Sequence, residues 1–199
     1  MTELRPPFLK KLIDTAVPPA FSGTKNHDCT SVFLLIYHRQ RIPYILAILK
    51  ADTPGYAWRN QVALPGGHID ETDNTPLDAA FRELEEEIGI LKCQVAYIGS
   101  LGHFQTIQQK DIEVFVGVWE GDRKKLTYDP KEISQILEIP VETLLKTHIE
   151  KQFNGRIPGV MELIYPHSDI VVWGVTARIF HYFCEQLLIH PGVSVIPPG

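Results

Sequence analysis

The sequence has little cysteine and no long uninterrupted run of apolar residues. Its three cysteines, Cys29, Cys93 and Cys184, are odd in number and far apart, which argues against a disulfide framework and against a cysteine-based zinc site. No stretch reaches the roughly 18 apolar residues that a membrane-spanning helix needs, and the first residues lack the apolar run of a signal peptide. These absences predict a protein of the reducing cytoplasm with no membrane partner.

Basic charge is also scarce. The chain has 19 Lys and Arg against 24 Asp and Glu, and its formal net charge is -5. Because no excess of positive charge is present to displace the counterions of a nucleic acid, the sequence predicts no nucleic-acid partner. The 8 histidines are scattered and never show H-E-x-x-H spacing, so none is interpreted as a zinc ligand.

The size of the chain predicts a single domain. It has 199 residues, of which 44% are hydrophobic, which is enough for one well-buried core and too few for two. No internal repeat or low-complexity segment interrupts it. We expect an N-terminal helix and loop over residues 1–29, one domain over 30–190 and a C-terminal tail over 191–199.

Residues 64–90 have the pattern of a glycine turn, an acidic loop and a helix. Thr75 is placed to cap that helix, Pro76 suits its first position, and Gly89 supplies the left-handed residue that ends it. At about 100° per residue, one side of the helix is apolar and is expected to pack on a core. That side carries Leu77, Ala80, Phe81, Leu84 and Ile88.

Three glutamates, Glu83, Glu86 and Glu87, share another face of the same helix. Their spacing brings like charges together, which costs roughly a few tenths of a kcal/mol per pair unless a cation intervenes. Carboxylates of this kind suit Mg²⁺ or Mn²⁺ together with the oxygens of a substrate phosphate, which favours metal-assisted hydrolysis. Taken alone, a glutamate-rich helix face is more often solvated surface, so the interpretation depends on the context.

The context is a Gly-Gly turn before the helix and an Arg-Glu pair within it. The run from Arg82 to Ile90, RELEEEIGI, resembles the second half of the Nudix box, whose usual pattern is G-x5-E-x7-R-E-U-x-E-E-x-G-U with U apolar. The first half differs, because Arg82 is the fifteenth residue after Gly67 instead of the fourteenth. The position expected to hold a glutamate has Asn74, with Asp73 beside it.

This longer loop is similar to the coenzyme A diphosphatase branch of the Nudix family. Its Gly-Gly-x-x-Asp-x-x-Asp form is matched by Gly66, Gly67, Asp70 and Asp73. Residues 61–67, QVALPGG, and residues 173–179, WGVTARI, also resemble segments of that branch. The likeness extends from about Thr30 to Leu188.

The resemblance implies an α/β fold, in the wider sense α+β, built as a Nudix-type α/β/α sandwich on a mixed β-sheet. It implies a Mg²⁺ or Mn²⁺ cofactor held by the Gly67 carbonyl and by Glu83, Glu86 and Glu87. One of these glutamates, or Glu132 from outside the box, would orient or deprotonate the attacking water, and Arg82 would hold the acidic cluster in place. Glu113 is the second candidate for this role from outside the box. For both Glu132 and Glu113, plain solvent exposure or an ion pair with a nearby lysine such as Lys131 is an equally good interpretation.

Binding of coenzyme A would also need cations for its 3′-phosphate. The basic residues that the branch carries before the glycine turn are mostly absent, and Lys50 and Arg59 are the remaining local candidates. Ordinary surface charge explains both equally well. Arg178 could contact a phosphate or cap a helix.

Three functions stay open. The first is hydrolysis of coenzyme A or acyl-CoA to 3′,5′-ADP and (acyl-)4′-phosphopantetheine. The second is hydrolysis of another small-molecule nucleotide substrate, such as an NDP-sugar, ADP-ribose or a dinucleoside polyphosphate. The third is a non-catalytic nucleotide-binding sensor. Whether the protein is a homodimer is left open as well.

Elsewhere, the apolar patterns predict elements whose positions can be checked. We expect helices at 8–16 and 141–145, strands at 30–37, 43–49, 93–99, 113–119 and 160–165, and a strand after Asp169 that leads into a closing helix to about Ile189. Trp119, Trp173 and Phe180 are expected in the core, and Thr176 as a helix cap. Residues 103–110 are expected to form a hairpin loop near the substrate. Its Gln and Thr residues could contact a ligand, but most loop residues are only solvated, which is the favoured interpretation.

Overall fold

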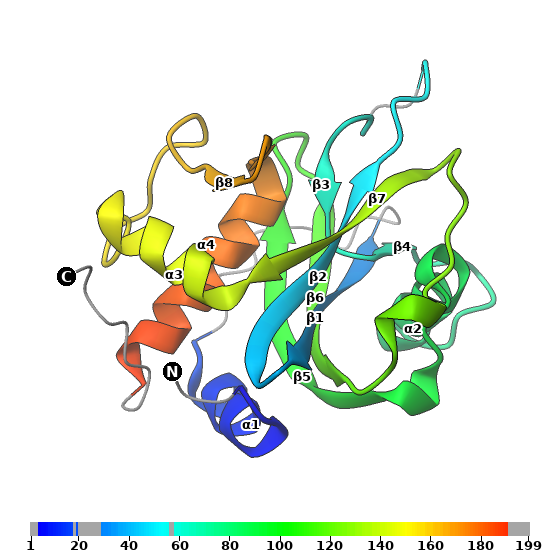
Figure 1. Cartoon of the computed structure of the whole chain (residues 1–199), viewed down its shortest axis with the longest axis horizontal. Helices are drawn as coiled ribbons and strands as arrows, with labels where there is room; N and C mark the ends of the chain where they lie inside the picture. The colour runs from blue at the N-terminus through cyan, green and yellow to red at the C-terminus, as the bar shows by residue number, and fades with distance from the viewer. Residues whose placement is uncertain (1–3, 18, 20–28, 56–57, 191–199) are drawn as a thin grey trace.

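The computed structural model of the chain describes residues 4–17, 19, 29–55 and 58–190 (Figure 1). Most of the loop expected before residue 30 and the tail expected over 191–199 lie outside these ranges. The expected domain boundaries therefore stay predictions.

A seven-stranded mixed sheet forms the centre of the molecule (Figure 1). Its main path has the order β3-β2-β1-β6-β5, while β4 pairs with β1 and β7 pairs with β2. β1 runs parallel to β6 and antiparallel to β2. The strands are β1 Thr30–Arg39, β2 Ile42–Lys50, β3 Val62–Ala63, β4 Gly66–His68, β5 Val95–Gln105, β6 Asp111–Trp119 and β7 Ile133–Pro140.

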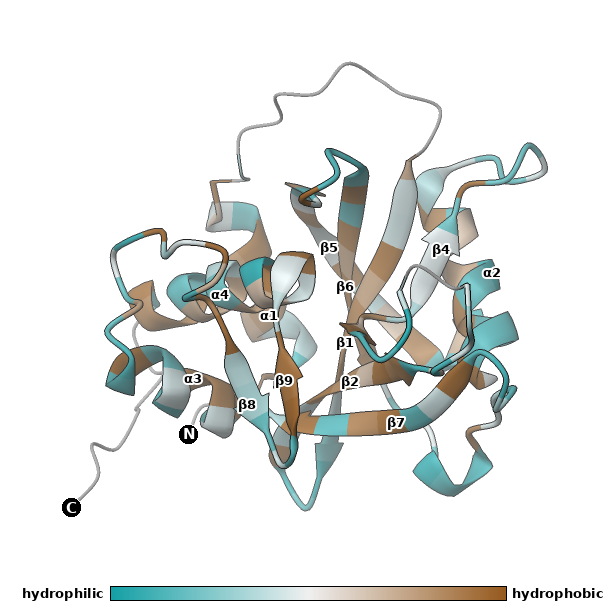
Figure 2. Cartoon of the chain, turned by 90° about the horizontal axis from the view of Figure 1, so that it is seen from above, coloured by the Kyte–Doolittle hydropathy of each residue, from teal (hydrophilic) through white to brown (hydrophobic). Residues whose placement is uncertain are grey.

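Helices cover both faces of this sheet, as predicted. The helices are α1 Pro6–Thr15, α2 Pro76–Ile88, α3 Val141–Glu150 and α4 Gly174–Ile189, with short 3₁₀ helices η1 Lys92–Gln94 and η2 Arg123–Lys125. α2 lies on one face, and α1, α3 and α4 lie on the other (Figure 1). In β1, Phe33 and Leu35 pack toward α2, whereas Leu34 and Ile36 pack toward the opposite helices. The middle parts of the central strands are therefore apolar (Figure 2), as expected for strands buried on both faces.

The local signals predicted for α2 are all present. The Thr75 side chain accepts a hydrogen bond of 3.1 Å from the Asp78 N–H, and Pro76 occupies the first turn. Gly89 ends the helix with a left-handed φ of 72°, which costs glycine little. The apolar side packs against the sheet through Ala80, Phe81, Leu84 and Ile88, with Leu77 partly buried. The box helix is thus fixed at both ends and along one side.

Three of the predicted elements differ in the structure. The strand expected at 160–165 is wrong, because the N–H groups of Glu162 and Leu163 close a turn on the Gly159 carbonyl. A short hairpin follows instead, formed by β8 Tyr165–His167 and β9 Ile170–Val172. α3 also continues past residue 145 to Glu150, and β5 begins only at Val95, after η1.

Two expectations for the start of α4 are wrong as well. Trp173 is 43% exposed, whereas Trp119 and Phe180 are buried as predicted. Thr176 does not cap the helix, because the N-cap is Trp173. The Thr176 hydroxyl donates instead to the Val62 carbonyl at 2.9 Å, so it ties α4 to β3. Within the described part of the chain, no helix has the length and apolar character needed to cross a bilayer.

Candidate functional site

A cavity of about 820 Å³ lies where the glycine turn, the acidic face of α2 and the start of α4 meet. Its wall includes Gly66, Gly67, Glu83, Glu86 and Glu87. The structure therefore brings together the four residues predicted to hold a metal. Glu132, from the segment before β7, lines the same cavity.

Arg82 connects the acidic loop to the helix. Its Nη1 donates to Glu83 Oε1 at 2.9 Å and to Glu86 Oε2 at 3.1 Å. Its Nε and Nη2 donate to the two oxygens of Asp73 at 3.2 and 2.9 Å, and Nη2 also reaches the His68 carbonyl. These bonds lower the pKa of Asp73 and raise the pKa of Arg82. Asp73 thus provides a carboxylate partner for Arg82 although Asn74 occupies the usual glutamate position.

Glu87 is the most buried of the three glutamates, with a side chain 7% exposed. Its Oε2 accepts from the Gly66 N–H at 2.9 Å, and its Oε1 forms an ion pair with the Lys50 ammonium at the end of β2. Both contacts offset the cost of burying a carboxylate. Lys50, predicted as a contact for the 3′-phosphate, therefore lies within the acidic cluster.

The Glu83 carboxylate lies against the glycine turn. A Cβ on Gly67 would come within 2.4 Å of Glu83 Cδ, so only glycine fits while Glu83 keeps its position. Burial raises the pKa of Glu83, and the neighbouring charges of Glu87 and Glu86 raise it further, while Arg82 acts in the opposite direction. A carboxylate in such a negative setting is one that a bound cation stabilises.

The other predicted residues have different surroundings. Arg59 is exposed and faces Asp52 at 3.8 Å, and Glu113 accepts a hydrogen bond of 3.0 Å from the Ser100 hydroxyl. Arg178 does not cap a helix in this contact, because it donates to the carbonyl of Gln105 at the end of β5 at 3.0 Å. As far as the structure describes the chain, the wall of the cavity beside α2 contains none of the residues Arg59, Glu113 and Arg178.

The sequence did not reveal the apolar wall of the cavity. This wall includes Trp58, Trp173 and Val175 together with Ile107 from the β5–β6 loop. Thr106, Gln108 and Lys110 from the same loop line the cavity too, which agrees with the expected place of this loop near the substrate. The one feature of the sequence that could have indicated this apolar wall is the position of Trp173, directly before the glycine that begins α4.

Comparison with known proteins agrees with this arrangement. Residues 26–157 match the NUDIX domain. The Nudix hydrolase NudL of Escherichia fergusonii, described as uncharacterized, is 30% identical over 84% of this chain and 87% of its own length. Its counterpart in Photorhabdus laumondii is 26% identical over 86% and 91%. The crystal structure of a MutT/nudix family protein from Enterococcus faecalis has a TM-score of 0.53 at 13% identity, covering 95% of this chain and 71% of that one, which supports the fold.

The chain therefore belongs to the Nudix family. It is an enzyme, a Nudix pyrophosphohydrolase.

Proposed function

We propose that this Nudix hydrolase cleaves the diphosphate of coenzyme A or an acyl-CoA, giving 3′,5′-ADP and (acyl-)4′-phosphopantetheine. The observation that carries the proposal is the loop between the glycine turn and α2. This loop has the extra residue and the Asp70 and Asp73 positions that resemble the coenzyme A diphosphatase branch, and Asp73 is engaged by Arg82. The adjoining segment 61–67 resembles that branch too.

The residues of the cavity fit a divalent cation such as Mg²⁺ or Mn²⁺. Glu83, Glu86 and Glu87 supply hard carboxylate oxygens, and Gly67, which lies against the Glu83 side chain, supplies a backbone carbonyl. When bound, such an ion neutralises charge on the phosphate oxygens and lowers the pKa of a water molecule. The ion pair between Lys50 and Glu87 supports the proposal only in that one carboxylate of the cluster already has a cation beside it.

Other residues in and around the cavity would supply the remaining roles in the reaction. Arg82 holds the Glu83 and Glu86 carboxylates in register with the loop. Glu132 faces the cavity without being part of the cluster, so it is placed to orient the attacking water or accept its proton, a role that one of the box glutamates could also fill. The apolar wall with Trp173 suits the non-phosphate part of a substrate.

A second substrate class is favoured by the surroundings of the predicted cations. Lys50 is paired with Glu87, and Arg59 faces Asp52, so each of these cations already has a carboxylate beside it. Lys110 and Lys131 line the cavity and are the alternative source of positive charge. A substrate without a 3′-phosphate, such as an NDP-sugar, ADP-ribose or a dinucleoside polyphosphate, would not need them for that group.

A panel of substrates tests the proposal. The enzyme with Mg²⁺ or Mn²⁺ is incubated with coenzyme A, dephospho-coenzyme A, ADP-ribose, UDP-glucose, diadenosine polyphosphates and NTPs, and the products are identified. Release of 3′,5′-ADP, with a higher kcat/KM for coenzyme A than for its dephospho form, supports the proposal. A preference for another compound supports the second class. Binding without turnover of any compound supports a sensor and contradicts both.

A further inference from the structure

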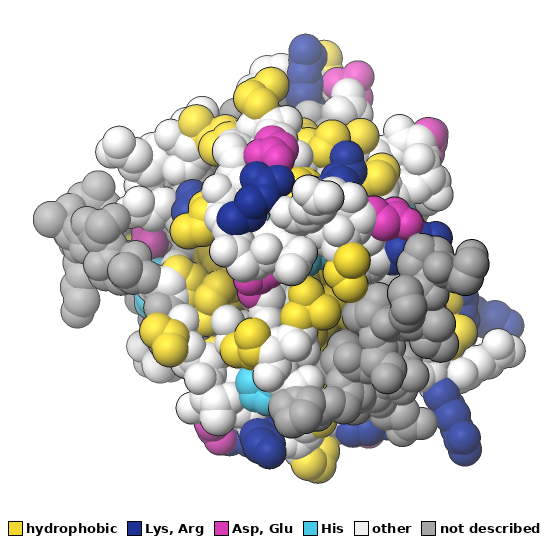
Figure 3. Space-filling model, turned by 90° about the vertical axis from the view of Figure 1, so that its left-hand side faces the viewer, with side chains coloured by type: hydrophobic (Ala, Val, Ile, Leu, Met, Phe, Trp, Pro, Cys, Tyr) yellow, Lys and Arg dark blue, Asp and Glu magenta, His cyan; other side chains and the backbone are white. Residues whose placement is uncertain are grey.

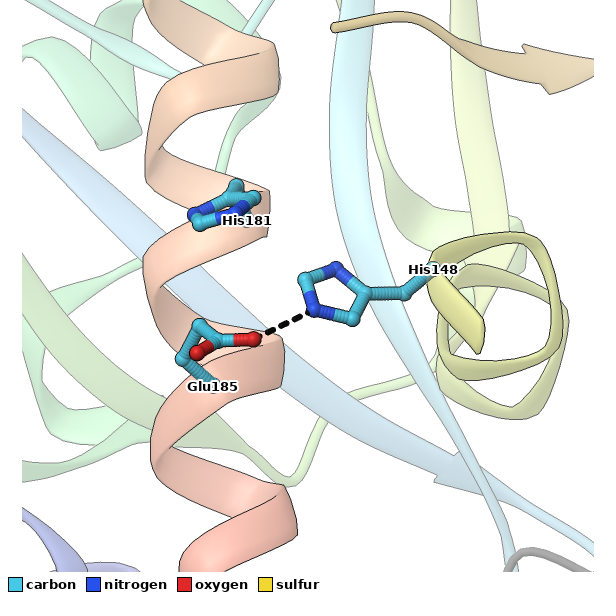
Figure 4. Close-up of side chains that lie close together, drawn as sticks. All are labelled: His148, His181 and Glu185. Atoms are coloured by element: carbon cyan, nitrogen blue, oxygen red, sulfur yellow. Dashed lines mark hydrogen bonds and ion pairs between the residues drawn. The ribbon is translucent and has the colours of Figure 1, made fainter. Parts of the chain in front are cut away.

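Two histidines and a glutamate converge between α3 and α4, on the face of the sheet opposite α2 (Figure 4). His148 comes from α3, and His181 and Glu185 come from α4. One nitrogen or oxygen atom from each residue lies within 4.8 Å of the others. The cluster is therefore separate from the Nudix site. It lies on α3 and α4 instead of α2, and it offers imidazole nitrogens as well as carboxylate oxygens.

The secondary structure explains the convergence. His181 and Glu185 are four residues apart on α4, a spacing that places both side chains on one face of a helix and lets one ion contact both. Figure 4 shows His148 reaching toward this face from α3. Because the third residue comes from another helix, no spacing motif in the sequence reveals the cluster.

Neighbouring groups hold the outer atoms of the cluster. His148 Nδ1 lies 2.8 Å from the Tyr165 hydroxyl, while Nε2 lies 2.6 Å from Glu185 Oε1. The other Glu185 oxygen accepts from the Gly155 N–H at 3.0 Å. His181 Nε2 is 3.3 Å from the Phe153 carbonyl. Metal-binding histidines and carboxylates are usually oriented by outer partners of this kind.

Burial suits the histidines to bind a metal. His148 is fully buried and His181 nearly so, and little histidine is visible on the surface that covers α3 and α4 (Figure 3). Imidazole nitrogens are common metal ligands, and these two are held in place inside the protein.

A second cavity, of about 660 Å³, gives access to the cluster. Its wall includes His181, Glu185 and Gln186. Gln186 is 8% exposed, and its Oε1 has no hydrogen-bond partner among the described residues. A buried polar atom without a partner beside a cavity indicates that the cavity holds water or a ligand.

We propose that His148, His181 and Glu185 bind one Zn²⁺ ion, whose fourth position faces this second cavity. Two imidazoles and one carboxylate form a donor set that zinc uses in sites with an open position. Mg²⁺ prefers oxygen ligands and water, so the ligands separate this ion from the one expected at the Nudix site.

Binding requires a small rearrangement. With bonds of about 2.0–2.1 Å, the ligand atoms of a tetrahedral zinc site lie roughly 3.4 Å apart, so the cluster contracts while the contact between His148 and Glu185 opens. The ion takes the place of the hydrogen on His148 Nε2. That hydrogen moves to Nδ1, which then donates to the Tyr165 hydroxyl oxygen. The ion also joins α3 to α4.

Zinc binding is measured on the full chain carrying Glu83→Gln, Glu86→Gln and Glu87→Gln, so that the Nudix site does not contribute. The protein is stripped of metal with a chelator, loaded with Zn²⁺ and passed through gel filtration. We expect one Zn²⁺ per chain to remain bound, measured by mass spectrometry of the metal. Co²⁺ in its place should show the intense visible absorption of a four- or five-coordinate ion.

Adding Glu185→Gln to this background tests the cluster. Glutamine keeps an acceptor for the Gly155 N–H but loses the charge, and we expect at least about tenfold weaker zinc binding. His167→Ala, which removes a histidine of β8, is the control and should bind zinc normally. Equal zinc binding with and without Glu185→Gln overturns the proposal, as does the lack of any bound zinc or cobalt absorption in the folded background protein. Circular dichroism confirms that each variant is folded.

Discussion

Arg82 and Asp73 form a two-point contact across the extended loop, with Nε–Oδ1 and Nη2–Oδ2 distances of 3.2 and 2.9 Å. The same guanidinium holds Glu83 and Glu86. The position of the acidic loop and that of the glutamates are therefore coupled through one side chain.

The first prediction concerns this contact. Asp73→Asn keeps the shape of the side chain but removes the charge that Arg82 engages. We expect turnover to fall by about 10- to 100-fold, the usual effect of losing a partner that orients a metal ligand, with a smaller change in KM. An unchanged kcat in steady-state assays at saturating Mn²⁺ would show that Arg82 does not need Asp73.

The same residue predicts a dependence of stability on pH. Arg82 lowers the pKa of Asp73 in the folded protein, so the ionised carboxylate stabilises the fold above the ordinary carboxyl pKa of about 4. This stabilisation is lost as the pH falls through the lower folded pKa. In thermal unfolding, the difference in Tm between the parent protein and Asp73→Asn should therefore be present at pH 7 and shrink in acid. A constant difference at every pH would contradict this.

The second prediction separates function from stability on one helix. Glu86→Gln should lower turnover by about 10²-fold or more, with little change in Tm because the Glu86 side chain is 59% exposed. Glu85→Gln is the matched control, since Glu85 is an exposed neighbour that does not line the cavity. Equal turnover of the two variants would remove Glu86 from the mechanism.

The third prediction concerns the glycine turn. Gly67→Ala would place a methyl group 2.4 Å from Glu83 Cδ, so Glu83 must move, at a cost of about 1–3 kcal/mol. We expect a folded protein with weakened Mn²⁺ binding and low turnover. Gly159→Ala, where a Cβ meets no atom within 4 Å, should behave like the parent protein. Normal Mn²⁺ binding by Gly67→Ala in calorimetry would contradict the close packing inferred here.

The fourth prediction concerns the buried pair of Lys50 and Glu87. Lys50→Met leaves Glu87 buried without its positive partner, which should lower the free energy of unfolding by about 3–5 kcal/mol. If the acidic cluster binds a cation, Mn²⁺ should raise the Tm of Lys50→Met more than that of the parent protein. An equal rise in both proteins would mean that the ion does not act on Glu87.

The predictability of the site depended on how local each signal was. The cap at Thr75, the left-handed Gly89 and the apolar side of α2 arise from neighbouring residues, so the sequence was sufficient for them. The pairing of Lys50 with Glu87 joins β2 to α2, and no local pattern predicts which residue of a strand reaches a distant helix. Asp73 was singled out only through the resemblance, and its contact with Arg82, which joins the loop to the helix, was not predicted.

The wrong structural predictions concern residues whose apolar character fits more than one environment. Residues 160–165 have the apolar content of a strand, but the turn on Gly159 takes up the backbone N–H groups that a strand would need. Trp173 is large and apolar and was therefore expected in the core, yet it lies at the N-cap of α4 in the wall of the cavity. The cluster of His148, His181 and Glu185 escaped notice because its members lie on two helices.

The most direct test of the account is a crystal soaked in Mn²⁺ and measured for anomalous scattering. The account predicts a peak bounded by the carboxylates of Glu83, Glu86 and Glu87 and by the Gly67 carbonyl. A crystal soaked at a saturating Mn²⁺ concentration that shows no peak at this position would contradict the account.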